Sequence, residues 1–265
     1  MRIKNRLRSI LLVAVAAMIN SSCTEKINLK LNDSSPRLTI ECSVNDGPGP
    51  YYVILTKSRL YTENNAFTGL PSAQIIISDD AGNSDTLTEA IAGLYRTSTL
   101  QGTVGRTYKI SITTEGTTYQ SICKMPPPVD IDSLEIIDET NFKGEVKKNA
   151  NIYVRDPAGV QNDYRVTSVL NDSLSTGFHI HSDRLWDGKL RTFNVPQGDL
   201  HSGDKLKVNL LSIDAHIYTY FSQFNQNQNN FGAPAAPANP DPVYTPSALG
   251  YFSAHSIKSK TIIVP

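Results

Sequence analysis

An excess of positive charge is the first thing that the sequence lacks. Lysine plus arginine and aspartate plus glutamate number 25 each. Four of the basic residues, Arg2, Lys4, Arg6 and Arg8, lie in an N-terminal segment that we expect to be removed. The mature chain is then slightly acidic. A nucleic-acid-binding surface or an electrostatic membrane patch needs clustered positive charge, so this balance argues against both.

Long apolar runs are equally scarce. The longest covers residues 10–19 and follows the basic residues of the N-terminus. At ~1.5 Å per helical residue it is about 15 Å long, roughly half of the hydrocarbon core of a bilayer. It is too short for a transmembrane helix and typical of the apolar part of a secretory signal peptide. We expect no other segment of the sequence to span a bilayer as a helix.

Small residues, Ser21 and Ser22, follow the apolar run and precede Cys23. This order is typical of a bacterial lipoprotein signal, in which cleavage precedes the cysteine and the thiol carries the lipid. An ordinary signal peptide with an incidental cysteine is the alternative. We predict that residues 1–22 are the signal peptide, that Cys23 is lipidated, and that residues 23–36 form a tether.

Cysteine is rare, with three in the chain, and lipidation of Cys23 leaves Cys42 and Cys123. An even pair in an oxidising compartment is compatible with a disulfide. Such a bond would close a loop of about 80 residues and stabilise the fold by roughly 4–5 kcal/mol in the chain-entropy model. Two buried free thiols explain the same pair equally well, so both alternatives stay open.

Helical periodicity is missing from the first half of the mature chain. Short β-rich segments alternate there with turn signals, about ten residues apart. The run Ile75-Ile-Ile77 marks a buried strand, and Asp79-Asp-Ala-Gly-Asn83 marks the turn that follows it. About seven such strands predict an immunoglobulin- or transthyretin-like β-sandwich over residues 37–125.

The second half begins after a run of prolines at positions 126–128, and we place a stiff linker at residues 126–132. Residues 133–265 predict a second β-sandwich-like domain, closed by strands at 248–255 and 260–264. One segment changes period: Ile217, Phe221 and Phe224 recur at helical spacing and predict an amphipathic helix over residues 215–228. The predicted fold is therefore all-β, with one helix in the second domain.

Signatures of catalysis are missing as well. The sequence contains no Gly-x-Ser-x-Gly, no His-Glu-x-x-His and no phosphate-binding loop. We therefore expect neither enzymatic activity nor a cofactor. A surface hydrolase with dispersed carboxylates is the alternative, because the two carboxylates of a glycosidase can be distant in sequence.

Two groups of residues have the chemistry of metal ligands. His179, His181 and Asp183 occupy alternate positions of a predicted strand and share one face of it. A polar, solvent-facing strand surface explains them more simply, so we predict no metal site. The acidic run from Asp79 to Asp85 has the hard oxygens that calcium prefers, but a hairpin turn explains it better.

Short motifs occur in a defined order along the mature chain. They are Ser22-Cys23, Asn45-Asp-Gly-Pro-Gly-Pro-Tyr51, Ile77-Ser-Asp-Asp-Ala-Gly-Asn83, Gly93-Leu-Tyr-Arg96, Gly105-Arg-Thr-Tyr108, Pro126-Pro, Asp156-Pro-Ala-Gly159, Leu211-Ser-Ile-Asp214 and Leu249-Gly-Tyr-Phe-Ser253. In this order the chain resembles the Bacteroidota lipoproteins grouped as domain of unknown function 4249. The resemblance implies an outer-membrane lipoprotein, often encoded beside a TonB-dependent transporter, and it implies no catalytic residues.

We accordingly expect a non-enzymatic accessory subunit or ligand-binding partner of a TonB-dependent nutrient transporter. It would be anchored to the outer membrane by its lipid, with the cell-surface side favoured, and would bind a small nutrient, peptide or glycan. A purely structural envelope lipoprotein is a further alternative. The expected partner-binding residues are aromatic residues of the helix and of the Pro-rich segment 231–246: Tyr218, Phe221, Phe224, Phe231 and Tyr244.

Overall fold

Alternating burial defines most strands, as the sequence pattern predicts. In strand β7 (Thr107–Thr114), for example, Tyr108, Ile110 and Ile112 are buried and the residues between them are more exposed. The structure is a computed structural model and describes residues 36–59, 67–140, 144–175, 177–228 and 239–265. The predicted lipid attachment at Cys23 and the candidate residue Phe231 lie outside these ranges.

Sixteen strands and one helix are present in the described residues. The strands of the first half are β1 (Leu38–Asn45), β2 (Tyr52–Lys57), β3 (Gln74–Asp79), β4 (Ser84–Thr86), β5 (Thr88–Ile91), β6 (Leu94–Arg96), β7 and β8 (Thr117–Lys124). The elements of the second half are β9 (Ile131–Thr140), β10 (Val146–Arg155), β11 (Asp163–Leu170), β12 (Ser173–Leu174), β13 (His179–Ser182), β14 (Leu190–Asn194), β15 (Lys205–Ile213), α2 (Ala215–Gln228) and β16 (Leu249–Ile263).

These strands form three sheets. A nine-stranded sheet has the order β12-β11-β15-β16-β1-β2-β6-β5, with β13 also paired to β11. A four-stranded sheet has the order β4-β3-β7-β8, and a three-stranded sheet has the order β14-β10-β9. The all-β class with one helix is thereby confirmed.

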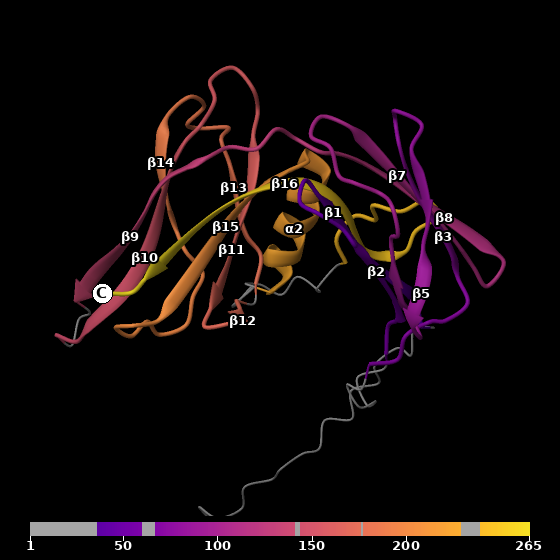
Figure 1. Cartoon of the computed structure of the whole chain (residues 1–265), viewed down its shortest axis with the longest axis horizontal. Coiled ribbons are helices and arrows are strands. Elements are labelled where there is room, and N and C mark those ends of the chain that lie inside the picture. The colour runs from indigo at the N-terminus through magenta and orange to yellow at the C-terminus, as the bar shows by residue number, and fades with distance from the viewer. Residues whose placement is uncertain (1–35, 60–66, 141–143, 176, 229–238) are drawn as a thin grey trace, which may run out of the picture. The chain divides into compact units, whose positions relative to one another are not determined.

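Strand β16 joins the two halves of the chain (Figure 1). Its first part pairs in parallel with β1, from Thr39 opposite Leu249 to Asn45 opposite His255. Its second part pairs antiparallel with β15, from Ser212 opposite Ser256 onward. The two closing strands predicted at 248–255 and 260–264 are thus one continuous strand. Its first part pairs with a strand of the first half, and its second part pairs with a strand of the second half. The predicted linker at residues 126–132 therefore does not separate the hydrogen bonding of the two halves.

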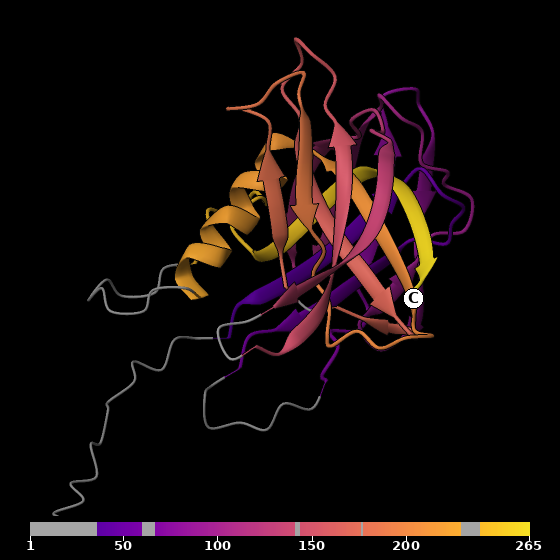
Figure 2. The same ribbon diagram turned by 90° about the vertical axis from the view of Figure 1, so that its left-hand side faces the viewer.

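Two hydrophobic cores fill the described part of the chain. The first includes Ile40, Val53, Ile77 and Ile110, contributed by the four-stranded sheet and by β1 and β2. The second includes Val154 and the other buried side chains between the three-stranded sheet and β11 and β15. Helix α2 contacts β11, β13 and β16, and Figure 2 shows it at one side of the strands. No helix among the described residues is both long and apolar enough to cross a membrane.

Candidate functional site

Helix α2 begins at a side-chain cap, and this cap fixes one wall of the candidate site. The carboxylate of Asp214 accepts the N–H of His216 at 2.9 Å, and the Asp214 carbonyl accepts the N–H of Tyr218 at 3.0 Å. An aspartate before the first helical residue satisfies a backbone donor that would otherwise lack a partner. The Leu211-Ser-Ile-Asp214 motif thus sets the position at which the helix starts.

Aromatic packing holds α2 against the strands. The ring of Phe221 stacks on Phe178 at 4.4 Å between centroids, and the guanidinium of Arg165 lies 4.9 Å from the Phe178 ring. Phe221 is only 1% exposed, and Tyr244 is 2% exposed. Their proposed role in partner binding is therefore wrong, because both side chains belong to the first core. Tyr218 and Phe224 are partly exposed.

A cavity of about 500 Å³, which we call the α2 cavity, lies beside the helix. Its apolar lining comes from β8, α2, β16 and the segment before β16, and includes Ile122, Ile217, Tyr220, Val243 and Phe252. A cavity of this size accommodates a small ligand or a few residues of peptide. The helical spacing in the sequence predicted α2, but nothing in the sequence pattern indicated that Ile122 or Val243 would line a cavity beside it.

Polar side chains stand around this apolar lining: Lys124, Asp214, His216, Gln223 and Asp241. Gln223 donates its amide to Asp241 at 2.7 Å, and its carbonyl accepts the Asp241 N–H at 2.8 Å. These two hydrogen bonds fasten the segment before β16 to the helix and keep the cavity wall in place. An apolar lining with a few convergent polar groups is typical of a binding site.

A larger cavity of about 860 Å³ lies in the second half, beside the β11–β12 hairpin. Lys148, His179 and Gln197 are among its lining residues, and within the described part of the chain the His179 imidazole is the one aromatic ring that lines it. The ammonium of Lys148 also pairs with Asp138 at 3.2 Å. We place the candidate site at the α2 cavity, because aromatic and apolar surface supplies most of the free energy of binding in such sites.

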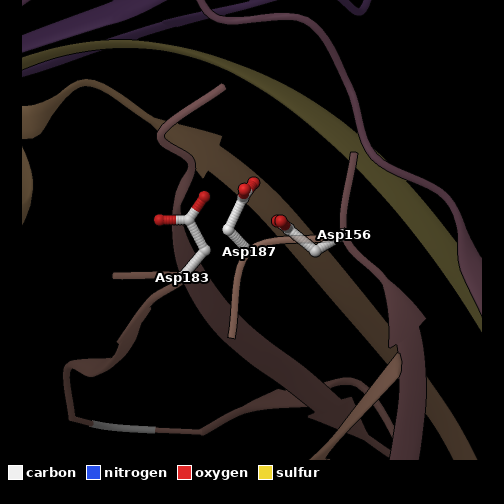
Figure 3. A group of neighbouring side chains, drawn as sticks. All are labelled: Asp156, Asp183 and Asp187. Carbon is white, nitrogen blue, oxygen red and sulfur yellow. The ribbon is translucent and has the colours of Figure 1, made fainter. Parts of the chain in front are cut away.

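Three carboxylates, from Asp156, Asp183 and Asp187, converge between two loops (Figure 3). Their ligand oxygens lie within 4.8 Å of one another. Each carboxylate also accepts a hydrogen bond. Asp156 accepts from the hydroxyl of Tyr164, and Asp183 accepts from the N–H of Asn162 at 2.7 Å. Asp187 accepts from a backbone N–H at 2.8 Å. Burial and the charges of Asp156 and Asp187 raise the pKa of Asp183. These bonds explain the cluster as a cross-link between loops.

The histidines that the sequence placed beside Asp183 do not join this cluster. His179 lies on the exposed part of β13, and the ring of His181 stacks on Phe193 at 4.1 Å. Burial, and next the charges of His179 and Arg191, lower the pKa of His181 to about 4. Asp183 has carboxylate neighbours instead, because the loop after β13 turns it toward Asp156 and Asp187.

The acidic run from Asp79 to Asp85 forms a hairpin turn, as the simpler explanation predicted. The Asp79 carboxylate accepts the backbone N–H of Asn83 at 2.9 Å and is also bonded by Arg106. Although burial acts in the opposite direction, the hydrogen bonds from Asn83 and Arg106 lower its pKa to about 2. Asp85 accepts the N–H of Thr99 at 2.6 Å. The two carboxylates therefore point at different protein donors.

Cys42 and Cys123 are buried free thiols in the structure, and the disulfide alternative is not formed. They lie on β1 and β8, which belong to different sheets: β1 pairs with β16 and β2, and β8 pairs with β7. The sulfur of Cys123 accepts the N–H of Ala254 at 3.1 Å. Cys123 also lines the α2 cavity, but burial raises its pKa to about 12, so it is not a thiolate nucleophile at neutral pH.

The fold and the site define an all-β protein with a cavity beside its helix. The chain belongs to the family described as Domain of unknown function (DUF4249), whose model matches residues 24–261. The family that the motif order suggested is thereby confirmed. No curated protein matches the chain.

Proposed function

We propose that this protein is a non-enzymatic lipoprotein that binds a partner or nutrient beside a TonB-dependent transporter of the outer membrane, and that the α2 cavity is its binding site. The observation that carries the proposal is the cavity of about 500 Å³ at the helix. The signal-like N-terminus with Cys23 supports the lipid anchor. The resemblance described above supports the association with a transporter.

The anchor is tested by Cys23→Ser. Without a cysteine the lipid has no attachment point, and we expect the protein to move from the membrane fraction to the soluble fraction. Retention of the variant in the membrane fraction would contradict the lipid anchor.

The binding site is tested by filling the cavity. Thr219 lies on α2 and lines the cavity, whereas Gln226 is exposed on the same helix and does not line it. The tagged, detergent-extracted protein should capture a TonB-dependent transporter as wild type and as Gln226→Trp, but not as Thr219→Trp. Capture of the transporter by Thr219→Trp, or no capture by the wild type, would contradict the proposal.

A further inference from the structure

Strand β8 is the last strand of its sheet, and part of its outer edge is open. At Gln120 this edge is closed: Gln120 and Thr245 exchange two backbone hydrogen bonds, each of 2.9 Å. Because backbone groups alternate in direction along an antiparallel strand, Ile122 turns its N–H and C=O to the same outer side. No backbone group among the described residues bonds to Ile122 on that side.

The open edge borders the α2 cavity. Ile122 and Lys124 both line the cavity, and Val243 lines it from the segment that also contains Thr245. This segment is hydrogen-bonded to β8 at Gln120. At Ile122 and Val243 the α2 cavity lies between the segment and β8. Ile122 is 63% exposed. An apolar side chain on an unpaired strand edge is a feature that sheets normally avoid, because such an edge pairs readily with another chain.

Charge around the cavity is unequal. The helix side carries the carboxylates of Asp214 and Asp241, and the strand side carries the ammonium of Lys124. The rim thus favours a ligand with a positive group on the side of the helix. The position of the Asp241 carboxylate is fixed by Gln223, whose amide donates to one of its oxygens at 2.7 Å.

We propose that the edge of β8 at Ile122 and the α2 cavity together bind an extended peptide that has an apolar side chain and a basic side chain on the same face. The peptide adds a short strand to the four-stranded sheet. Its backbone exchanges hydrogen bonds with Ile122, its apolar side chain enters the cavity, and its basic side chain lies near Asp241. Backbone pairing gives such peptides affinity, and the pocket for alternate side chains gives specificity. The inference rests on the proposed function and names the chemistry of its partner.

The test uses the full-length lipoprotein in detergent and a fluorescein-labelled probe peptide, Gly-Thr-Leu-Thr-Lys-Thr-amide. Fluorescence polarisation measures its Kd. Ile122→Pro removes the outward N–H, and proline is tolerated where an edge strand points its N–H outward. Ile122→Val keeps the N–H and is the matched control. We expect Ile122→Pro to weaken binding about tenfold and Ile122→Val to leave it nearly unchanged.

A second variant tests the charge. Asp241→Asn should weaken binding of the probe about fivefold, but should leave unchanged the binding of a probe with norleucine in place of lysine. A probe that is N-methylated at leucine and at both flanking threonines provides a test that leaves the protein unaltered, and it should not bind. This last measurement decides the question if Ile122→Pro fails to fold.

Equal binding of the N-methylated and the unmodified probe would overturn the inference, and so would the absence of probe binding to the wild type. A wild-type dimer that Ile122→Pro dissociates in sedimentation would show that a second copy occupies the edge, which also overturns it. If the probe does not bind while Thr219→Trp still abolishes capture of the transporter, the inference fails and the proposed function stands.

Discussion

A β-carbon on Gly250 would lie 2.0 Å from the carbonyl oxygen of Ile40. The two residues are partners in the parallel pairing of β1 with β16. Gly250 also has a φ of +93°, a conformation that side chains with a β-carbon rarely adopt. Glycine is therefore required here for two reasons, the close approach of the backbones and the left-handed conformation. The connection between the two halves of the fold depends on it.

We predict that Gly250→Ala lowers the free energy of unfolding by at least about 3 kcal/mol. Gly82→Ala is the matched control, because Gly82 has a φ of +86° but nothing within 4 Å of its β-carbon position. The control should lose about 1 kcal/mol, the cost of the backbone conformation alone. Urea titration of both variants measures the difference. Equal losses would contradict the close approach of Ile40 and Gly250.

The sequence predicted the fold class because strand alternation and helical spacing are local patterns. Tyr108, Ile110 and Ile112 mark β7 without reference to any other part of the chain. The pairing of β1 with β16 joins Thr39 to Leu249, and no local pattern contains that information. The single strand β16 was consequently predicted as two short strands, both assigned to the second half.

The candidate site was predicted only as far as the helix. The helical spacing of Phe221 and Phe224 predicted α2, but the burial of Phe221 depends on Arg165 of β11 and on Phe178, which directly precedes β13. Phe221 and Tyr244, which the sequence offered as partner-binding residues, are therefore core residues. The open edge at Ile122 could not be predicted either, because it exists only where Thr245 pairs with Gln120 and then diverges.

The hydroxyl of Tyr164 donates to Asp156, and both side chains are buried. Tyr164→Phe leaves the Asp156 carboxylate without this donor, so we expect the free energy of unfolding to fall by about 1–3 kcal/mol. Tyr52→Phe is the control, since Tyr52 is 46% exposed and should lose little. Urea titration at pH 7 measures both. A loss in Tyr164→Phe no larger than that of the control would contradict a structural role for this bond.

Two histidines, one buried (His255) and one partly buried (His181), predict a loss of stability in mild acid. Burial lowers the pKa of His181 and of His255 from 6.5 to about 4. The unfolded chain therefore takes up protons as the pH falls below about 6.5, whereas the folded protein does not until about pH 4, so stability is lost across this window. Each group should cost about 3 kcal/mol at pH 4.

Replacing one of these histidines should reduce that pH dependence. His255→Asn should unfold at a urea concentration that changes less between pH 7 and pH 4.5 than in the wild type. His201→Asn, at a side chain that is 78% exposed, is the control and should behave as the wild type. A wild type whose urea midpoint is the same at both pH values would contradict the burial of these rings.

Cys42 and Cys123 should be unreactive in the folded protein and free after unfolding. Burial raises the pKa of both thiols, and a thiol reacts as its thiolate. Titration of the protein with a thiol reagent should detect neither of these two cysteines in buffer and both in guanidinium, without any reductant. Detection of no thiols in guanidinium would instead establish the disulfide alternative, which closes a loop of about 80 residues.

Asp183 should destabilise the folded protein at neutral pH. Burial and the neighbouring carboxylates raise the pKa of Asp183. The folded state therefore holds the Asp183 proton more tightly than the unfolded state does. The stability that this proton contributes is lost as the pH rises through the raised pKa. Asp183→Asn removes the charge and keeps an oxygen to accept the Asn162 N–H. We therefore expect this variant to be more stable than the wild type at pH 7, and the difference to shrink toward pH 4.

Asp187→Asn, at the exposed member of the cluster, is the control and should gain less. Urea titration of all three proteins in EDTA, which removes divalent cations, measures the difference in stability. The prediction would be contradicted if Asp183→Asn were less stable than the wild type at pH 7.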